Sequence, residues 1–288
     1  MKLLTFYKDG KLKPAVSTDK GVLDISGSYP TMIEAIERYE GLNEFLDFAL
    51  EENSNYYLDT ADLKYGPAID CMDKIICVGL NYQKHADESD MPAPEHPILF
   101  SKYKNSLSGH EEKVAIPREA TQVDYEAELA IVIGKEAKDV PAEEALDYVF
   151  GYTCSNDLSE RTFQFRSGQW LLGKSLDGFC PLGPYIVTKD EIEDPNKLRI
   201  SCSVNGESRQ DSNTNDMIFN CQQIISYTSK YMTLKPGDVI LTGTPEGVAL
   251  GHEGEEKPWL EAGDEVVVEI ERLGRLVTNM KGGIECIL

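Results

Sequence analysis

Residues 123–134 read Val123-Asp124-Tyr125-Glu126-Ala127-Glu128-Leu129-Ala130-Ile131-Val132-Ile133-Gly134, two glutamates followed by an apolar, β-branched run. The run predicts a buried β-strand. On a strand, residues two apart point to the same face, so Glu126 and Glu128 would aim both carboxylates at one point. Such a pair beside a dry core is costly unless a cation shares the site. Oxygen ligands favour a hard ion, Mg²⁺, Mn²⁺ or Ca²⁺, over zinc. The alternative is a solvent-facing start of a strand.

The chain has 288 residues, enough for one large core or two modest domains. No apolar run approaches the roughly 18 residues that a membrane span needs, and the N-terminus lacks a signal-peptide core, so we expect a cytoplasmic protein. The net charge of -22 argues against nucleic acid and anionic membranes as partners. A small anionic substrate stays compatible with it, because a local metal can override the global field.

The seven cysteines are scattered, odd in number and without a CxxC spacing. Neither a zinc site nor a thioredoxin-type pair is indicated. We therefore expect buried, reduced thiols that pack as small hydrophobic side chains.

The pattern along the chain divides near residue 70. Residues 1–70 predict a small N-terminal domain with a few strands and helical spacing over 31–51. Residues 71–288 are β-rich, with a helix expected at 141–148 and another that begins near Asp216 as N-cap. Strands are expected at 75–79, 97–100, 128–134, 148–153, 185–188, 198–204, 238–243, 265–270 and 275–280.

Two further polar clusters follow predicted strands. Asp157 comes directly after one strand and could be a third oxygen ligand, although an aspartate before Leu-Ser-Glu-Arg also suits a helix N-cap. His85 and Glu88 lie three residues apart, so they would share a face of a helical turn. A glutamate that orients an imidazole produces a general base, whereas the alternative is a surface pair or a pair of metal ligands.

Residues 168–175 match the phosphate-binding pattern GxxxxGK[ST] in form only. We reject a P-loop here, because no buried strand precedes the motif and the following Leu176–Pro184 segment cannot form a helix. Lys174 could instead hold a carboxylate or enolate oxygen near an acidic site, or be a surface lysine. In the 241–248 loop, which contains Thr244, backbone N–H groups could grip a carboxylate.

Five ordered motifs together resemble the fumarylacetoacetate hydrolase superfamily over about residues 74–280. They are Ile-Cys-Val-Gly-Leu-Asn-Tyr-x-x-His-x-x-Glu (76–88), Asp-Tyr-Glu-x-Glu-Leu (124–129), Asn-Asp-Leu-Ser-Glu-Arg (156–161), Gly-Lys-Ser-Leu-Asp (173–177) and Leu-Thr-Gly-Thr-Pro-Glu-Gly-Val (241–248). The resemblance implies an α+β, β-rich fold: a mixed β-roll or sandwich catalytic domain with a small N-terminal α/β domain. It also implies a homodimer that binds one Mg²⁺ or Mn²⁺ per active site.

The resemblance also implies a role for each motif residue. It makes Glu126, Glu128 and Asp157 the metal ligands, and His85 and Glu88 the pair that activates water. It makes Lys174 the residue that stabilises developing charge, and it implies three substrate contacts, Arg161, Gln164 and Thr244.

The implied reaction is metal-dependent hydrolysis of the C–C bond of an acylpyruvate-like or 2,4-diketo acid, which releases pyruvate or a related 2-keto acid through a metal-bound enolate. The same motifs serve oxaloacetate decarboxylation and isomerisation of a hydroxymuconate-type diacid, so they do not choose among these reactions. A more remote alternative is a catalytically silent metal-binding protein. Residues 163–171 resemble members acting on diketo-deoxy sugar acids more than short acylpyruvases.

Overall fold

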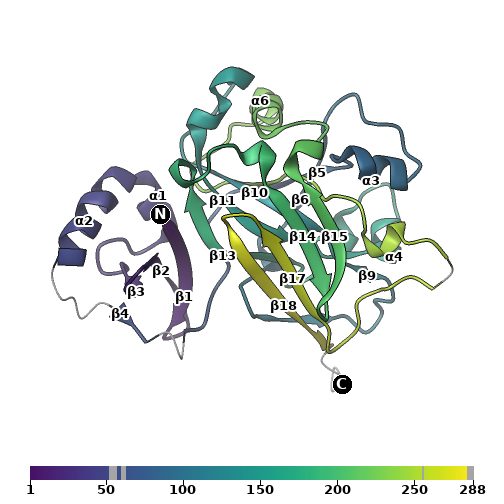
Figure 1. Ribbon diagram of the computed structural model, residues 1–288, viewed down its shortest axis with the longest axis horizontal. Coiled ribbons are helices and arrows are strands. Elements are labelled where there is room, and N and C mark those ends of the chain that lie inside the picture. Colours follow the sequence, from purple (N-terminus) through teal and green to yellow (C-terminus); the bar gives the residue numbers. More distant parts are fainter. Residues whose placement is uncertain (52–56, 60–62, 255, 284–288) are drawn as a thin grey trace.

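The computed structural model describes residues 1–51, 57–59, 63–254 and 256–283, and Figure 1 shows their arrangement. The strands are β1 Lys2–Lys8, β2 Lys11–Thr18, β3 Gly21–Asp24, β4 Tyr57–Leu58, β5 Ile75–Gly79, β6 Ile98–Lys102, β7 Leu107–Ser108, β8 Lys113–Ile116, β9 Val123–Asp124, β10 Ala127–Ile133, β11 Val149–Asn156, β12 Ser159–Glu160, β13 Cys180–Thr188, β14 Arg199–Val204, β15 Glu207–Asn213, β16 Val239–Leu241, β17 Glu265–Ile270 and β18 Gly274–Gly282. The α-helices are α1 Met32–Glu37, α2 Tyr39–Glu51, α3 Gln83–Glu88, α4 Arg161–Gln164, α5 Leu171–Lys174 and α6 Cys221–Tyr231. The predicted β-rich α+β class is confirmed.

The strands form three sheets within the described residues. The largest has the order β4-β3-β2-β1-β13-β11-β10-β16-β5-β6, with β7 paired to β13, and the second has the order β15-β14-β17-β18-β8. A short third sheet pairs β12 with β9. The large sheet is mixed, because β16 and β5 run parallel whereas β10 and β11 run antiparallel.

The apolar run after the two glutamates is the centre of the large sheet, as its composition predicts. Every residue of β10 is buried, and the two faces of the strand serve different cores. Leu129 and Ile131 pack in the core shared with the second sheet, whereas Ala130 and Val132 pack in the core shared with the N-terminal helices. A strand covered on both faces reads as a continuous apolar run rather than an alternating one.

The N-terminal strands and helices lie together at one side of the molecule, and β1 continues the large sheet by pairing antiparallel with β13 (Figure 1). The helical spacing predicted over 31–51 is present as two helices, because Arg38 leaves helical geometry between them. Thr31 caps the first of them by accepting a hydrogen bond from the Glu34 N–H. The division of the chain at residue 70 stays a prediction.

Two predicted helix details are corrected. The helix expected from Asp216 begins at Cys221, because Asn220 and Gln223 form a reciprocal capping box there. Asp216 lies instead at the end of a 3₁₀ turn and accepts a hydrogen bond from the Lys84 backbone N–H. The helix expected at 141–148 is a 3₁₀-helix, Ala142–Tyr148, with Pro141 just before it.

The cysteines among the described residues are free, and Cys71 is half-buried whereas the other five are buried. Cys286 lies outside the described residues. Within the described ranges, no helix is both long and apolar enough to cross a membrane.

Candidate active site

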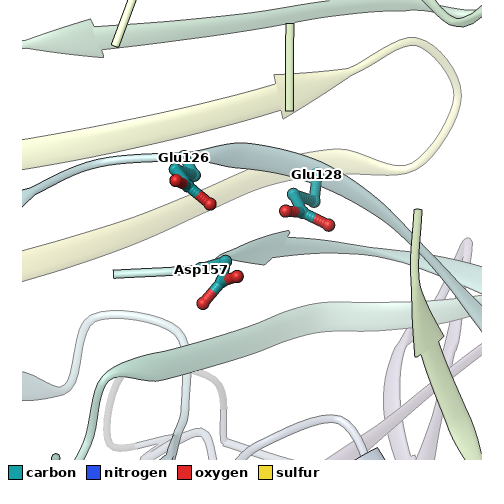
Figure 2. Close-up of side chains that lie close together, drawn as sticks. All are labelled: Glu126, Glu128 and Asp157. Carbon is teal, nitrogen blue, oxygen red and sulfur yellow. The ribbon is translucent and has the colours of Figure 1, made fainter. Parts of the chain in front are cut away.

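The three predicted metal ligands converge at one buried point (Figure 2). Glu126 immediately precedes β10, Glu128 lies within it, and Asp157 immediately follows β11. One carboxylate oxygen from each residue lies within 4.8 Å of the others. The pairing of Ala127 with Asn156 sets this convergence, and the Asp157 N–H donates to the Glu126 carbonyl oxygen at 2.9 Å.

Two buried cations neutralise part of this acidic cluster. Lys174 Nζ, at the end of α5, donates to Glu126 Oε2 at 2.7 Å and to Asp157 Oδ2 at 2.8 Å. Arg161 Nη2 lies 2.7 Å from Glu126 Oε1. Burial would raise the pKa of Glu126, but Lys174 and Arg161 outweigh it and lower this pKa to about 2. Burial would likewise lower the pKa of Lys174, but Asp157 and Glu126 raise it overall.

The sequence analysis missed two charged residues of this site, Lys102 and Asp124. Lys102, at the end of β6, is fully buried at its side chain and contacts Asp157 Oδ1, and it also donates to the Leu158 carbonyl at 3.1 Å. Asp124 Oδ2 lies 2.7 Å from Arg161 Nη2. Asp124 continues the two-residue spacing of the glutamates, which was a usable signal, whereas nothing local marks Lys102.

Glu128 shows why the site suits a divalent cation. Burial first, and then the charges of Asp157 and Glu126, raise the pKa of Glu128 well above its usual range. The Gly243 N–H donates a hydrogen bond to Glu128 Oε2 at 2.7 Å. Ionisation of Glu128 is therefore opposed at a point where three carboxylates converge, and a bound cation would favour it. The all-oxygen donor set fits Mg²⁺ or Mn²⁺.

The predicted pair of a histidine base and its orienting carboxylate, His85 and Glu88, is present in α3. His85 Nδ1 lies 3.2 Å from Glu88 Oε2, and His85 lines the cavity that also reaches Glu126 and Glu128. The Gly247 N–H donates to Glu88 Oε1 at 3.1 Å. Gly251 packs directly against this carboxylate, since a Cβ there would lie 2.3 Å from Glu88 Cδ. Glu88 is therefore held in place from the loop after β16, and it can orient the imidazole.

The three predicted substrate contacts line the same cavity of about 230 Å³. Gln164 Oε1 accepts a hydrogen bond from Arg161 Nη1 at 2.9 Å, and Thr244 Oγ1 accepts one from Gln210 Nε2 at 2.9 Å. The structure thus brings all nine predicted site residues to one place. Their individual roles stay predictions.

The fold does not adopt three alternative interpretations of these motifs. Asp157 does not cap the following helix, because Glu160 does so by accepting from the Phe163 N–H at 2.6 Å. The P-loop-like segment is not a P-loop, since α4 rather than a strand precedes it and no helix follows Lys174 before β13. Lys174 is buried, which excludes a surface lysine.

Comparison with known proteins shows which proteins this chain resembles. The family model for the C-terminal region of fumarylacetoacetate (FAA) hydrolase matches residues 74–281. The mitochondrial oxaloacetate tautomerase Fahd2a of Rattus norvegicus is 41% identical over 291 residues, which cover 97% of this chain and 91% of the relative. A fumarylacetoacetate hydrolase from Exiguobacterium antarcticum has a TM-score of 0.82 at 34% identity, covering 98% of this chain and 99% of its own. Maleylpyruvate hydrolase from Sphingobium sp. SYK-6, solved with manganese(II) and pyruvate, has a TM-score of 0.82 at 30% identity, covering 99% of this chain and 100% of its own.

Proposed function

The chain belongs to the fumarylacetoacetate hydrolase family of enzymes, and from this premise we propose that it interconverts the keto and enol forms of a 2-keto acid of the oxaloacetate class. The similarity to the rat oxaloacetate tautomerase carries the proposal, because it is 41% over 97% of the chain, against 30% for the maleylpyruvate hydrolase. C–C hydrolysis, the reaction expected first, becomes the second candidate. Oxaloacetate decarboxylation stays open beside it.

Keto–enol exchange of a 2-keto acid moves a proton between C3 and the keto oxygen. It requires a base near C3 and stabilisation of the charge that develops on that oxygen. His85, oriented by Glu88 at 3.2 Å, is the base in this proposal. A divalent ion held by Glu126, Glu128 and Asp157 would supply Lewis-acid polarisation of the keto group.

Lys174 is placed to assist the oxygen. Its ammonium has three donors, of which Glu126 and Asp157 take two, and the residue lines the cavity. The third N–H is therefore available to the developing oxyanion. Because its pKa is raised, Lys174 stays charged throughout the neutral range and acts as a donor rather than as a base.

Hydrolysis is favoured by one specific observation. A histidine held by a carboxylate is the arrangement that activates water, and His85 and Glu88 have it. In hydrolysis the same imidazole would take a proton from water, which then attacks a carbonyl carbon of the substrate. In the tautomerase it takes the proton from carbon instead, so the two reactions differ in whether water lies between His85 and the substrate.

The experiment follows the decay of enol absorbance of oxaloacetate with the purified protein and Mg²⁺, Mn²⁺ or excess EDTA. We expect the added metal to accelerate decay, EDTA to abolish the acceleration, and no pyruvate to form. Pyruvate from oxaloacetate would indicate decarboxylation, and pyruvate from acetylpyruvate without faster enol decay would favour the hydrolase. Metal binding without turnover of either acid would contradict both reactions and favour the catalytically silent metal-binding protein.

A matched pair of variants tests the base. Glu88→Gln keeps the size of the side chain but removes the charge that orients His85, so we expect kcat to fall by about tenfold or more. Asp87→Asn makes the same change at the neighbouring position of α3, where the Asp87 side chain accepts a hydrogen bond from Gln83 Nε2 at 2.9 Å. Equal rates in the two variants would contradict the assignment.

Three expectations stay predictions. The geometry accommodates either Mg²⁺ or Mn²⁺, and manganese(II) is present in the solved maleylpyruvate hydrolase. The homodimer and the cytoplasmic location likewise await measurement, and the name of the rat relative places that protein in mitochondria. Size-exclusion chromatography with light scattering would test the dimer.

A further inference from the structure

The cavity beside the acidic cluster is lined by two chemically different sets of side chains. One set carries charge: Glu126, Glu128, Arg161 and Lys174. The other set forms an apolar wall of large side chains: Val78, Met91, Phe100, Phe165, Trp170 and Leu250. The two sets adjoin, since Lys174 Nζ lies 5.0 Å from the centroid of the Phe100 ring. A 2-keto acid held by the charged set would therefore have the apolar wall beside the group on its C3.

The aromatic part of the wall is built by packing. The rings of Phe100 and Trp170 meet edge to face, with centroids 5.3 Å apart and planes at 69°. Trp170 can lie there because residue 79 is glycine: a Cβ at Gly79 would be 2.7 Å from the indole Cζ3. Phe165 and Met91 complete the wall from other loops and are 58% and 48% exposed. A bound apolar group would cover part of that exposed surface.

The charged residues that line the cavity also favour an apolar group on the substrate. Among the described lining residues, the fixed cations are Arg161 and Lys174, and each already pairs with carboxylates of the acidic cluster at 2.7 to 2.8 Å. The imidazole of His85 pairs with Glu88. A second carboxylate on the substrate, directed toward Phe100 and Trp170, would lose water and would have to share Lys174, which lies 5.0 Å from the Phe100 ring and already pairs with Glu126 and Asp157. For an aromatic group in that position, the transfer of its apolar surface out of water is favourable.

We infer that this cavity selects 2-keto acids whose C3 carries an aromatic or large apolar group, so that arylpyruvates such as phenylpyruvate are better substrates than oxaloacetate. The inference rests on the proposed keto–enol function and names its substrate class. The reaction balances without a co-reactant, because the C3–H bond breaks, His85 takes that proton, solvent water supplies the proton that forms the O–H bond of the enol, and His85 returns its proton to solvent. Trp170 is the residue that determines specificity.

The test compares kcat/KM for the enols of phenylpyruvate and oxaloacetate, with the metal-loaded protein. We expect the ratio to favour phenylpyruvate in the native chain and to fall about tenfold or more in Trp170→Ala. Gly79→Ala should lower the ratio as well, because its methyl group pushes the indole into the cavity. Leu172→Ala is the matched control: Leu172 lies in α5 two residues after Trp170, is 54% exposed and does not line the cavity, so its ratio should equal that of the native chain.

A calorimetric measurement of Kd for both acids separates this inference from the proposed function. Turnover of both acids with a ratio that favours oxaloacetate would overturn the inference and leave the function intact. Absence of turnover, with phenylpyruvate bound more tightly than oxaloacetate and the preference lost in Trp170→Ala, would support the selective cavity and reject the tautomerase. Tighter binding of oxaloacetate would overturn the inference whether or not turnover is seen.

Discussion

Glu128→Gln is expected to stabilise the metal-free protein while destroying its affinity for a divalent ion. Oxygens of Glu128, Glu126 and Asp157 lie within 4.8 Å of one another. Two negative charges at that separation repel by about 3 kcal/mol at an effective dielectric constant of about 20. Glutamine keeps the shape and can still accept the hydrogen bond from the Gly243 N–H, now 2.7 Å from the carboxylate. It removes the carboxyl group whose ionisation burial and the two neighbouring carboxylates oppose.

The sign and size follow from the pKa of Glu128, which burial and then Asp157 and Glu126 raise. Between the unfolded pKa of about 4.3 and the higher folded value, the folded state holds a proton that the unfolded state has lost. The free energy of unfolding therefore falls by about 1.4 kcal/mol per pH unit across that window as pH rises. Glutamine does not titrate, so the variant should match the native chain near pH 4 and become more stable than it by about 1.4 kcal/mol per pH unit as pH rises through that window.

The assay is urea unfolding in EDTA at a series of pH values, with calorimetric titration of Mn²⁺ alongside. Glu126→Gln, two residues earlier in the chain, is the control, and its expected effect on stability has the opposite sign. The pKa of Glu126 is lowered to about 2, so its charge should contribute about 3 kcal/mol above about pH 4.3, lost as pH falls toward 2. Parallel stability profiles for Glu128→Gln and the native chain, or a less stable Glu128→Gln, would refute this account of the cluster.

Three other predictions concern the same fold. Lys102→Met should destabilise the protein by about 3–5 kcal/mol in urea unfolding, because it leaves the buried carboxylate of Asp157 without one of its two cations; a loss below about 1 kcal/mol would contradict the pairing. Metal binding should release protons, because burial, Asp157 and Glu126 raise the pKa of Glu128 and the ion favours its ionised form, and titrations in buffers of different ionisation enthalpy measure the release; zero release across the pH series would show that Glu128 is already ionised before the ion binds. Asn220→Ala should lower the melting temperature through the loss of about 1 kcal/mol, because it opens the capping box with Gln223; an unchanged melting temperature would show that the cap contributes nothing.

Much of the candidate site could be predicted because its information is local. Glu126 and Glu128 are two apart on a strand, and His85 and Glu88 are three apart on a helix, so their spacing alone brings each pair to one face. The apolar run of β10 likewise shows burial in its composition. The start of α6 was misplaced because Asp216 and Asn220 are both good caps, and only Asn220 has a glutamine three residues on to complete a capping box.

By itself, then, the sequence determined the β-rich class, the acidic pair and the imidazole–carboxylate pair, since backbone periodicity converts their spacing directly into direction. The tertiary structure decided what surrounds them. Lys102 reaches Asp157 across 55 residues, and the Gly247 N–H reaches Glu88 across 159. The apolar wall exists because Gly79 leaves room for an indole from residue 170. No local pattern encodes such contacts, because they depend on which strands become neighbours in the sheet and on how side chains from separate segments fill the space between them.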